Sequence, residues 1–146
     1  MALAAAQPFV PPAIPWLQAL PLMAPEDLQL GPGLDPLLLH GGLQRVLALG
    51  SVLALVAFGS RARAEARGDS DLDLAVILAE PQLSPEQKAL WWARCREALG
   101  YTGVGVDLVV VGRADAERLS GSRWHVLGDV ARQGRVLYAA GGDVSR

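Results

Sequence analysis

Apolar residues group into short runs along the chain from residue 52 onwards, separated by polar segments. Continuous apolar runs at 52–58 and 72–78 are of strand length, and a third at 104–111 is interrupted by Asp107. Such runs are typical of strands buried on both faces of a sheet. A brief run at 136–138 predicts a fourth strand.

Helix-capping residues mark the segments between these runs. Asp35 followed by Pro36 predicts a helix start, and the Ser84-Pro85-Glu86-Gln87 sequence is typical of a capping box with a proline in the first turn. Helices are predicted over 37–49, 84–99, 114–119 and 124–133. The resulting order, α-β-β-α-β-α-α-β, indicates a compact α/β domain with a small mixed sheet packed by helices.

The N-terminal segment differs in composition from the rest. Residues 1–36 hold eight of the ten prolines, three acidic residues and no basic residue. Proline lacks the backbone donor that helices and sheets need, so an extended arm is expected. Its apolar side chains favour a tail that is partly docked on the domain. We therefore divide the chain into a Pro-rich arm at 1–36, a single domain at 37–140 and a short tail at 141–146.

Composition narrows the class of protein. Half of the 146 residues are hydrophobic and the net charge is −2, which argues against a disordered chain and gives no strong signal for nucleic-acid binding. The single cysteine, Cys95, excludes an internal disulfide and fits a cytoplasmic protein. We expect Cys95 to be a buried structural thiol, and His40 and His125 to lie at the core edge or surface. The run at 46–58 is too short to span a membrane.

Asp73 and Asp107 stand within predicted strands, where apolar residues would pack better, and Asp71 stands at the entry to the strand that holds Asp73. Asp71 and Asp73 are two residues apart, so on a strand their carboxylates share one face at ~6–7 Å. Like charges at that spacing repel unless a cation lies between them. Asp107 within an apolar strand would be costly to bury without a partner. Because carboxylate oxygens are the ligands that Mg²⁺ and Mn²⁺ prefer, the three together indicate a metal site.

A turn rich in glycine and arginine precedes this pair. Gly59 and Ser60 follow the first strand, where backbone N–H groups and the serine hydroxyl can hold a phosphate. Arg61, Arg63 and Arg67 add positive charge. Each feature has an ordinary explanation: Asp71 as a solvated strand end, Asp107 as an edge residue, and the arginines as a solvated loop face. Their conjunction indicates a site for a nucleoside triphosphate bridged by metal.

This conjunction resembles a known family. Gly-Ser, ten residues, then Asp-x-Asp and a later Asp within an apolar strand is similar to the DNA polymerase β-like nucleotidyltransferase superfamily, and GSRARAEARGDSDLDLAVIL to its minimal nucleotidyltransferase (MNT) group. The resemblance implies the nucleotidyltransferase fold, two Mg²⁺ ions held by Asp71 and Asp73, with Mn²⁺ as the alternative metal, and Asp107 on the ion that activates the acceptor. It also implies that ATP or another nucleoside triphosphate binds at Gly59 and Ser60, with Arg61 and Arg63 as further nucleotide contacts.

The same resemblance implies a partner. MNT proteins pair as antitoxins with helical HEPN toxins and transfer AMP to a HEPN tyrosine, so such a toxin is the expected partner and substrate. Two alternatives stay open: an antitoxin that acts by binding alone, and a transferase for a small molecule such as an aminoglycoside. One departure bears on activity, because Ala64 stands where the family usually has Gly. If that position has a positive φ, alanine costs about 1 kcal/mol or reshapes the loop.

Overall fold

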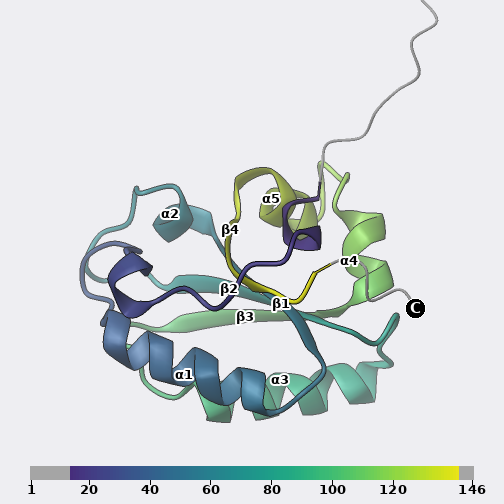
Figure 1. Cartoon of the computed structure of the whole chain (residues 1–146). Helices are drawn as coiled ribbons and strands as arrows, with labels where there is room; N and C mark the ends of the chain where they lie inside the picture. The colour runs from purple at the N-terminus through teal and green to yellow at the C-terminus, as the bar shows by residue number, and fades with distance from the viewer. Residues whose placement is uncertain (1–13, 142–146) are drawn as a thin grey trace, which may run out of the picture.

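A computed structural model describes residues 14–141 of the chain. The elements of this part are η2 (Pro15–Leu17), η3 (Pro25–Asp27), α1 (Pro36–Ala48), β1 (Val52–Phe58), α2 (Gly59–Ala62), β2 (Leu72–Leu78), α3 (Pro85–Leu99), β3 (Val106–Gly112), α4 (Arg113–Leu119), α5 (Val126–Gln133) and β4 (Arg135–Ala139). Helices α1 and α3 cover one face of the sheet, and α2, α4 and α5 lie on the other side (Figure 1). The predicted α/β fold with a mixed sheet is confirmed.

The sheet has the strand order β3-β2-β1-β4. Strand β1 is antiparallel to both β2 and β4, whereas β2 and β3 run parallel. The parallel pair is joined by α3, the crossover helix that such a connection needs. Consequently the end of β1 and the starts of β2 and β3 lie at the same end of the sheet.

Side-chain alternation along the strands divides the interior into two clusters. Leu72, Leu74 and Leu78 of β2 pack with α1 and α3, whereas Ala75 and Ile77 pack on the other face with α4 and α5. Both faces of β1 and β2 are buried, which explains why their sequences are continuous apolar runs.

The predicted helix starts are confirmed in detail. The Asp35 side chain accepts hydrogen bonds from the backbone N–H groups of Leu37 and Leu38. At α3, the Ser84 hydroxyl accepts from the Gln87 N–H while the Gln87 side chain accepts from the Ser84 N–H. These reciprocal bonds satisfy donors that a helix leaves unpaired at its start.

The N-terminal arm packs on the domain from residue 14 onwards. Trp16 is completely buried beside β4 and α5. Leu28 and Leu30 belong to the cluster on the opposite face of the sheet, with α1 and α3. Leu20 forms an isolated bridge with Ala139, exchanging two backbone hydrogen bonds. Residues 14–35 pack on the domain through apolar side chains, as expected. The backbone pairing of this arm with β4 was not expected, because the arm is rich in proline. The division at 36 stays a prediction, and residues 1–13 and 142–146 lie outside the described residues.

Over residues 14–141, none of the helices combines the length and the apolar character needed to cross a bilayer.

Candidate active site

The predicted aspartates come together at this end of the sheet. Asp73 on β2 lies opposite Asp107 on the parallel strand β3, and opposite Phe58 at the end of β1. Asp71 immediately precedes β2, and Gly59 immediately follows β1. Three segments distant in sequence therefore bring their polar residues to the same place.

Strand alternation also places the three carboxylates on one face. Asp71 and Asp73 share the parity of Ala75 and Ile77, which pack on the α4 and α5 side of the sheet. Asp107 shares the parity of Val111 on the same side. Asp73 is half-buried, while Asp71 and Asp107 are exposed. The predicted common face is therefore present, open to solvent at its rim.

Two glycines leave room for two of the carboxylates. A Cβ atom at Gly59, which has a φ of +73°, would collide with Oδ2 of Asp73. A Cβ atom at Gly105 would lie 2.5 Å from Oδ1 of Asp71. Each carboxylate thus lies directly over backbone that carries no side chain. Gly105 is a site residue that the sequence analysis missed, because its contact with Asp71 joins two segments that are distant in sequence.

The three carboxylates influence one another electrostatically. Partial burial raises the pKa of Asp73 above its usual value, and the charges of Asp107 and Asp71 raise it further. The guanidinium of Arg63 opposes this and lowers the pKa of Asp73. Asp73 is therefore the centre of a concentration of negative charge that one arginine only partly compensates.

The donor set has the chemistry of a site for a hard divalent cation. Carboxylate oxygens are suitable ligands, and a cation would relieve the repulsion that raises the pKa of Asp73. In the positions they have here, the side chains of residues 14–141 include no group of three or more His, Cys, Asp or Glu with the spacing of a metal site. Assignment of Asp71, Asp73 and Asp107 as metal ligands stays a prediction.

The turn at the end of β1 forms the short helix α2. Phe58 is its N-cap residue and supplies no side-chain hydrogen bond to the first N–H groups. Ser60, half-buried, lies in this first turn. Unpaired N–H groups at a helix start attract anions, and the phosphate-binding role of Gly59 and Ser60 stays a prediction.

Arg61 has a different role from the predicted one. Its side chain is only 2% exposed, and its guanidinium donates to the backbone carbonyls of Ser70, Leu30 and Arg67. Because these carbonyls occupy the donors, Arg61 is not placed to contact a nucleotide. It instead ties α2 to the loop just before Asp71 and to the N-terminal arm.

The other two arginines of the turn are exposed. Arg63 pairs with Glu65 at 2.9 Å and donates to the Gln133 side chain at 3.2 Å, so it bridges α2 and the end of α5. Arg67 offers its carbonyl to Arg61 and its N–H to the Ser70 hydroxyl. Arg63 is therefore the one arginine of this turn that lies close enough to Asp73 to affect its pKa.

Residues assigned to structural roles behave as predicted. Cys95 is fully buried, and burial raises the pKa of its thiol to about 11. His40 is half-buried and His125 is exposed, with Nδ1 of His125 accepting from the Leu127 N–H at the start of α5.

The family comparison decides the assignment. The family described as Polymerase beta, Nucleotidyltransferase matches residues 43–139, from within α1 to the end of β4. The chain belongs to this nucleotidyltransferase family. Its motif, Gly59-Ser60 followed by Asp71-x-Asp73, lies inside the matched segment. The predicted resemblance to the polymerase β superfamily is confirmed, and family membership indicates nucleotidyl-transfer chemistry.

Three solved structures are similar to parts of this chain at low identity. A protein of Sulfolobus solfataricus assigned as a nucleotidyltransferase is 15% identical with a TM-score of 0.48, over 67% of this chain and 74% of that one. A toxin–antitoxin structure with AMP-PNP is 24% identical with a TM-score of 0.44, over 67% and 71%. A complex of tri-AMPylated Shewanella oneidensis HEPN toxin with MNT antitoxin is 20% identical with a TM-score of 0.35, over 67% and 72%. No curated protein matches the chain.

Proposed function

We propose that this nucleotidyltransferase transfers AMP from ATP to a hydroxyl group of a partner protein in the cytoplasm, as the antitoxin of a HEPN/MNT pair. The proposal rests on one observation: Asp71, Asp73 and Asp107 lie beside the Gly59-Ser60 turn, at the same end and on the same face of the sheet. The similarity of the sequence of residues 59–78 to MNT proteins supports the antitoxin part of the proposal.

The proposed reaction is an in-line displacement at the α-phosphorus. The acceptor oxygen forms a bond to this phosphorus while the bond to the bridging oxygen of the β-phosphate breaks, so pyrophosphate leaves and the hydroxyl proton passes to solvent. Bound Mg²⁺ ions would neutralise the triphosphate and activate the hydroxyl. Asp71 and Asp73 would hold both ions, and Asp107 the ion nearer the acceptor.

The chain's own groups would position the nucleotide. N–H groups at the start of α2 and the Ser60 hydroxyl would receive phosphate oxygens, since Phe58 does not cap them. Arg63 lies at the rim with a charge that complements a triphosphate, and its ion pair with Glu65 is exposed and therefore weak enough to exchange. Arg61 would act indirectly, by holding Ser70 and thus the backbone leading to Asp71.

The described part of the chain supplies no domain of its own for binding an acceptor. Between Asp107 and residue 141, the chain completes β3, α4, α5 and β4, so residues 14–141 contain no additional domain over the carboxylates. A partner that supplies its own hydroxyl would satisfy this arrangement.

One observation favours a second candidate, an antitoxin that neutralises its partner by binding alone. Ala64 has a φ of +61°, which non-glycine residues adopt only at a cost, and it lies in the turn that would hold the phosphates. A strained turn could have lost part of its phosphate-binding role without loss of the fold.

The test combines the purified chain, the protein encoded by the adjacent gene, Mg²⁺ and ATP labelled at the α-phosphate. Label on the neighbouring protein is expected, and Asp71→Asn and Asp107→Asn should each reduce it by ~100-fold or more. Asp69→Asn is the matched control, since this exposed residue precedes the cluster and should retain transfer. A tight complex without label would favour the second candidate, and full transfer by Asp71→Asn would contradict the site.

A further inference from the structure

Strand β3 is an edge of the sheet with an open side. Within residues 14–141 it pairs only with β2, in an unbroken register from Val106 to Gly112. Its sequence, Val-Asp-Leu-Val-Val-Val-Gly, has no proline or lysine, and its pairing has no bulge, all devices with which proteins block such edges. Its one charged residue, Asp107, lies on the α4 and α5 face of the sheet, opposite the face that α3 covers. A row of backbone donors and acceptors thus faces outwards, and an extended peptide is the chemistry that pairs with it.

This edge forms the floor of a groove that is lined by both apolar and charged side chains. A hollow of about 390 Å³ runs along residues 108–111, with Trp92 of α3 on one side and Leu119 and Val126 on the other. The side chain of Trp92 is 44% exposed. Trp124, next to the groove residue His125, is 94% exposed. Exposed aromatic side chains beside an unpaired strand are typical of a contact surface.

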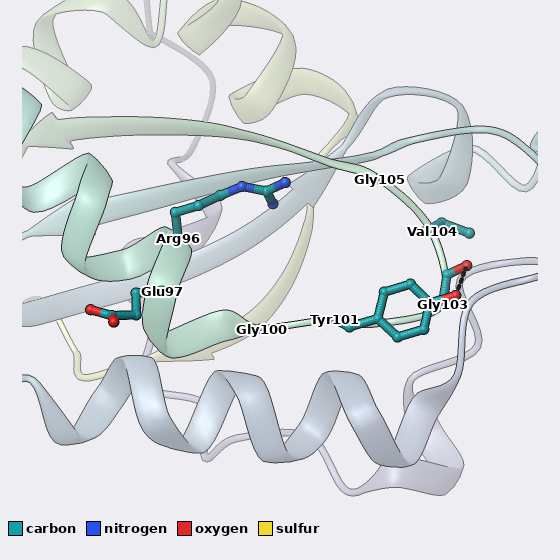
Figure 2. Close-up of a pocket in the computed structure, with 7 residues that line it drawn as sticks. All are labelled: Arg96, Glu97, Gly100, Tyr101, Gly103, Val104 and Gly105. Carbon is teal, nitrogen blue, oxygen red and sulfur yellow. Dashed lines mark hydrogen bonds between the residues drawn. The ribbon is translucent and has the colours of Figure 1, made fainter.

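A basic stripe on α3 follows the groove. Lys88, Trp92 and Arg96 are four residues apart, so they lie along one side of the helix. Lys88 and Trp92 line the hollow at residues 108–111, and Arg96 lines a second hollow at Gly103–Gly105. Figure 2 shows the Arg96 side chain extending towards the strand that continues from Gly105, and Glu97 directed away from Arg96. The two hollows therefore succeed each other along the same strand.

Charge selects among the candidate occupants. Among the described residues, Lys88 and Arg96 take part in no ion pair, whereas Arg118 in the groove is paired with Asp115. A second copy paired antiparallel and centred on Trp92 would bring Lys88 against the other copy's Arg96, so like charges would meet. Residues 1–13 contain no acidic side chain and offer no complement either.

We propose that the β3 edge binds an extended, acidic segment of a partner protein as a fifth strand of the sheet. Backbone pairing with β3 supplies the alignment, apolar side chains of the segment pack against Trp92 and Leu119, and its acidic side chains meet Lys88 and Arg96. The end of the groove reaches Gly105, over which the Asp71 carboxylate lies. If the proposed function holds, the docked segment leads towards the carboxylates, but the docking itself does not depend on that function.

The experiment uses three synthetic peptides with the full chain. The acidic probe is acetyl-Glu-Val-Thr-Val-Glu-Val-Thr-Glu-amide, the basic probe has lysine for each glutamate, and the third has proline for the central valine. The acidic probe should slow hydrogen exchange in residues 106–112 and bind about tenfold more tightly than the other two. Its affinity should fall as salt increases, because exposed charges are screened.

Variants on α3 test the charge argument directly. The double change Lys88→Glu with Arg96→Glu should weaken the acidic probe about tenfold and favour the basic one. Arg94→Glu is the matched control, since Arg94 lies on another side of α3, where it stacks on Trp91 at 5.7 Å. Trp92→Ala should weaken both charged probes alike, by loss of apolar contact.

Several results would overturn the proposal. They are equal affinities for the acidic and basic probes, binding without protection of residues 106–112, or no binding at all. Protection of β3 in the free chain would also overturn it, by identifying a second copy if protection rises with protein concentration and the chain's own termini if it does not. Because every readout is binding, failure of the docking is distinguishable from failure of nucleotidyl transfer.

Discussion

The carboxylate of Asp73 occupies the space that a side chain at Gly59 would need. Gly59 has a φ of +73°, and a Cβ atom there would collide with Oδ2 of Asp73. The residue that begins the phosphate-binding turn and the central carboxylate are therefore placed against each other. This contact explains why glycine, rather than another small residue, precedes Ser60.

Replacement of Gly59 should affect metal binding more than stability. Gly59→Ala adds backbone strain of about 1 kcal/mol and forces the flexible Asp73 carboxylate to rotate away. Gly50→Ala is the matched control, because Gly50 has a φ of +83° with nothing within 4 Å of its added Cβ atom. Urea unfolding should give similar losses for both variants, whereas Mn²⁺ titration should show weaker binding for Gly59→Ala alone. Equal metal affinity in the two variants would contradict the role assigned to this contact.

The pKa of Asp73 predicts a pH dependence of stability. Burial and the neighbouring carboxylates raise this pKa above 3.8, so above that pH the folded chain binds more protons at Asp73 than the unfolded chain does. Stability is therefore lost as pH rises through the folded pKa, and Asp73→Asn should remove that loss. In chelator, the variant should gain stability relative to the natural chain as the pH rises above about 4.

Metal provides the control for this prediction. Mg²⁺ should restore the stability of the natural chain at pH 7 and have little effect on Asp73→Asn, since a ligand that binds only the folded state stabilises it. Unfolding midpoints in a pH series, with and without Mg²⁺, measure both effects. Parallel curves of stability against pH for the two proteins would mean that ionisation of Asp73 does not cause the loss of stability.

The elements and the carboxylates were predictable because each has a local cause. The predicted strands at 52–58 and 72–78 match β1 and β2, since continuous apolar runs of this length are typical of strands buried on both faces of a sheet. The helix at 37–49 was predicted despite Gly41 and Gly42, and the structure explains one of them. A Cβ atom at Gly42 would collide with the Leu99 carbonyl, so this glycine permits close packing of α1 on α3.

The errors concern partners that are distant in sequence. Arg61 and Arg63 are two residues apart in one loop, yet one is buried on carbonyls and the other is exposed beside Asp73. Composition cannot distinguish them, because the Leu30 carbonyl that Arg61 contacts belongs to the N-terminal arm. Gly105 was missed for the same reason: its partner, Asp71, lies on another segment.

Loss of Arg61 should be costly although it touches no substrate. Arg61→Ala leaves the carbonyls of Ser70, Arg67 and Leu30 without their donor, so we expect a loss of about 3 kcal/mol in unfolding free energy. Arg67→Ala, at an exposed residue of the same turn, should change it by less than ~0.5 kcal/mol. Lysine has one ammonium group for three carbonyls, so Arg61→Lys should lie between them. Denaturant unfolding distinguishes these values, and equal losses for Arg61→Ala and Arg67→Ala would contradict the structural role.

Ala64 offers a test in the opposite direction. Its φ of +61° meets the condition under which alanine is costly there, because glycine has no Cβ atom to clash with the backbone in this left-handed conformation. Ala64→Gly should therefore stabilise the chain by about 1 kcal/mol. The same change at Ala66 of this turn, which has no positive φ, should destabilise it.

If the strain at Ala64 also limits phosphate binding, Ala64→Gly should raise nucleotide affinity measured by titration with ATP and Mg²⁺. A gain in stability without a gain in affinity would separate the two effects, and a loss of stability would show that the turn relaxes without cost.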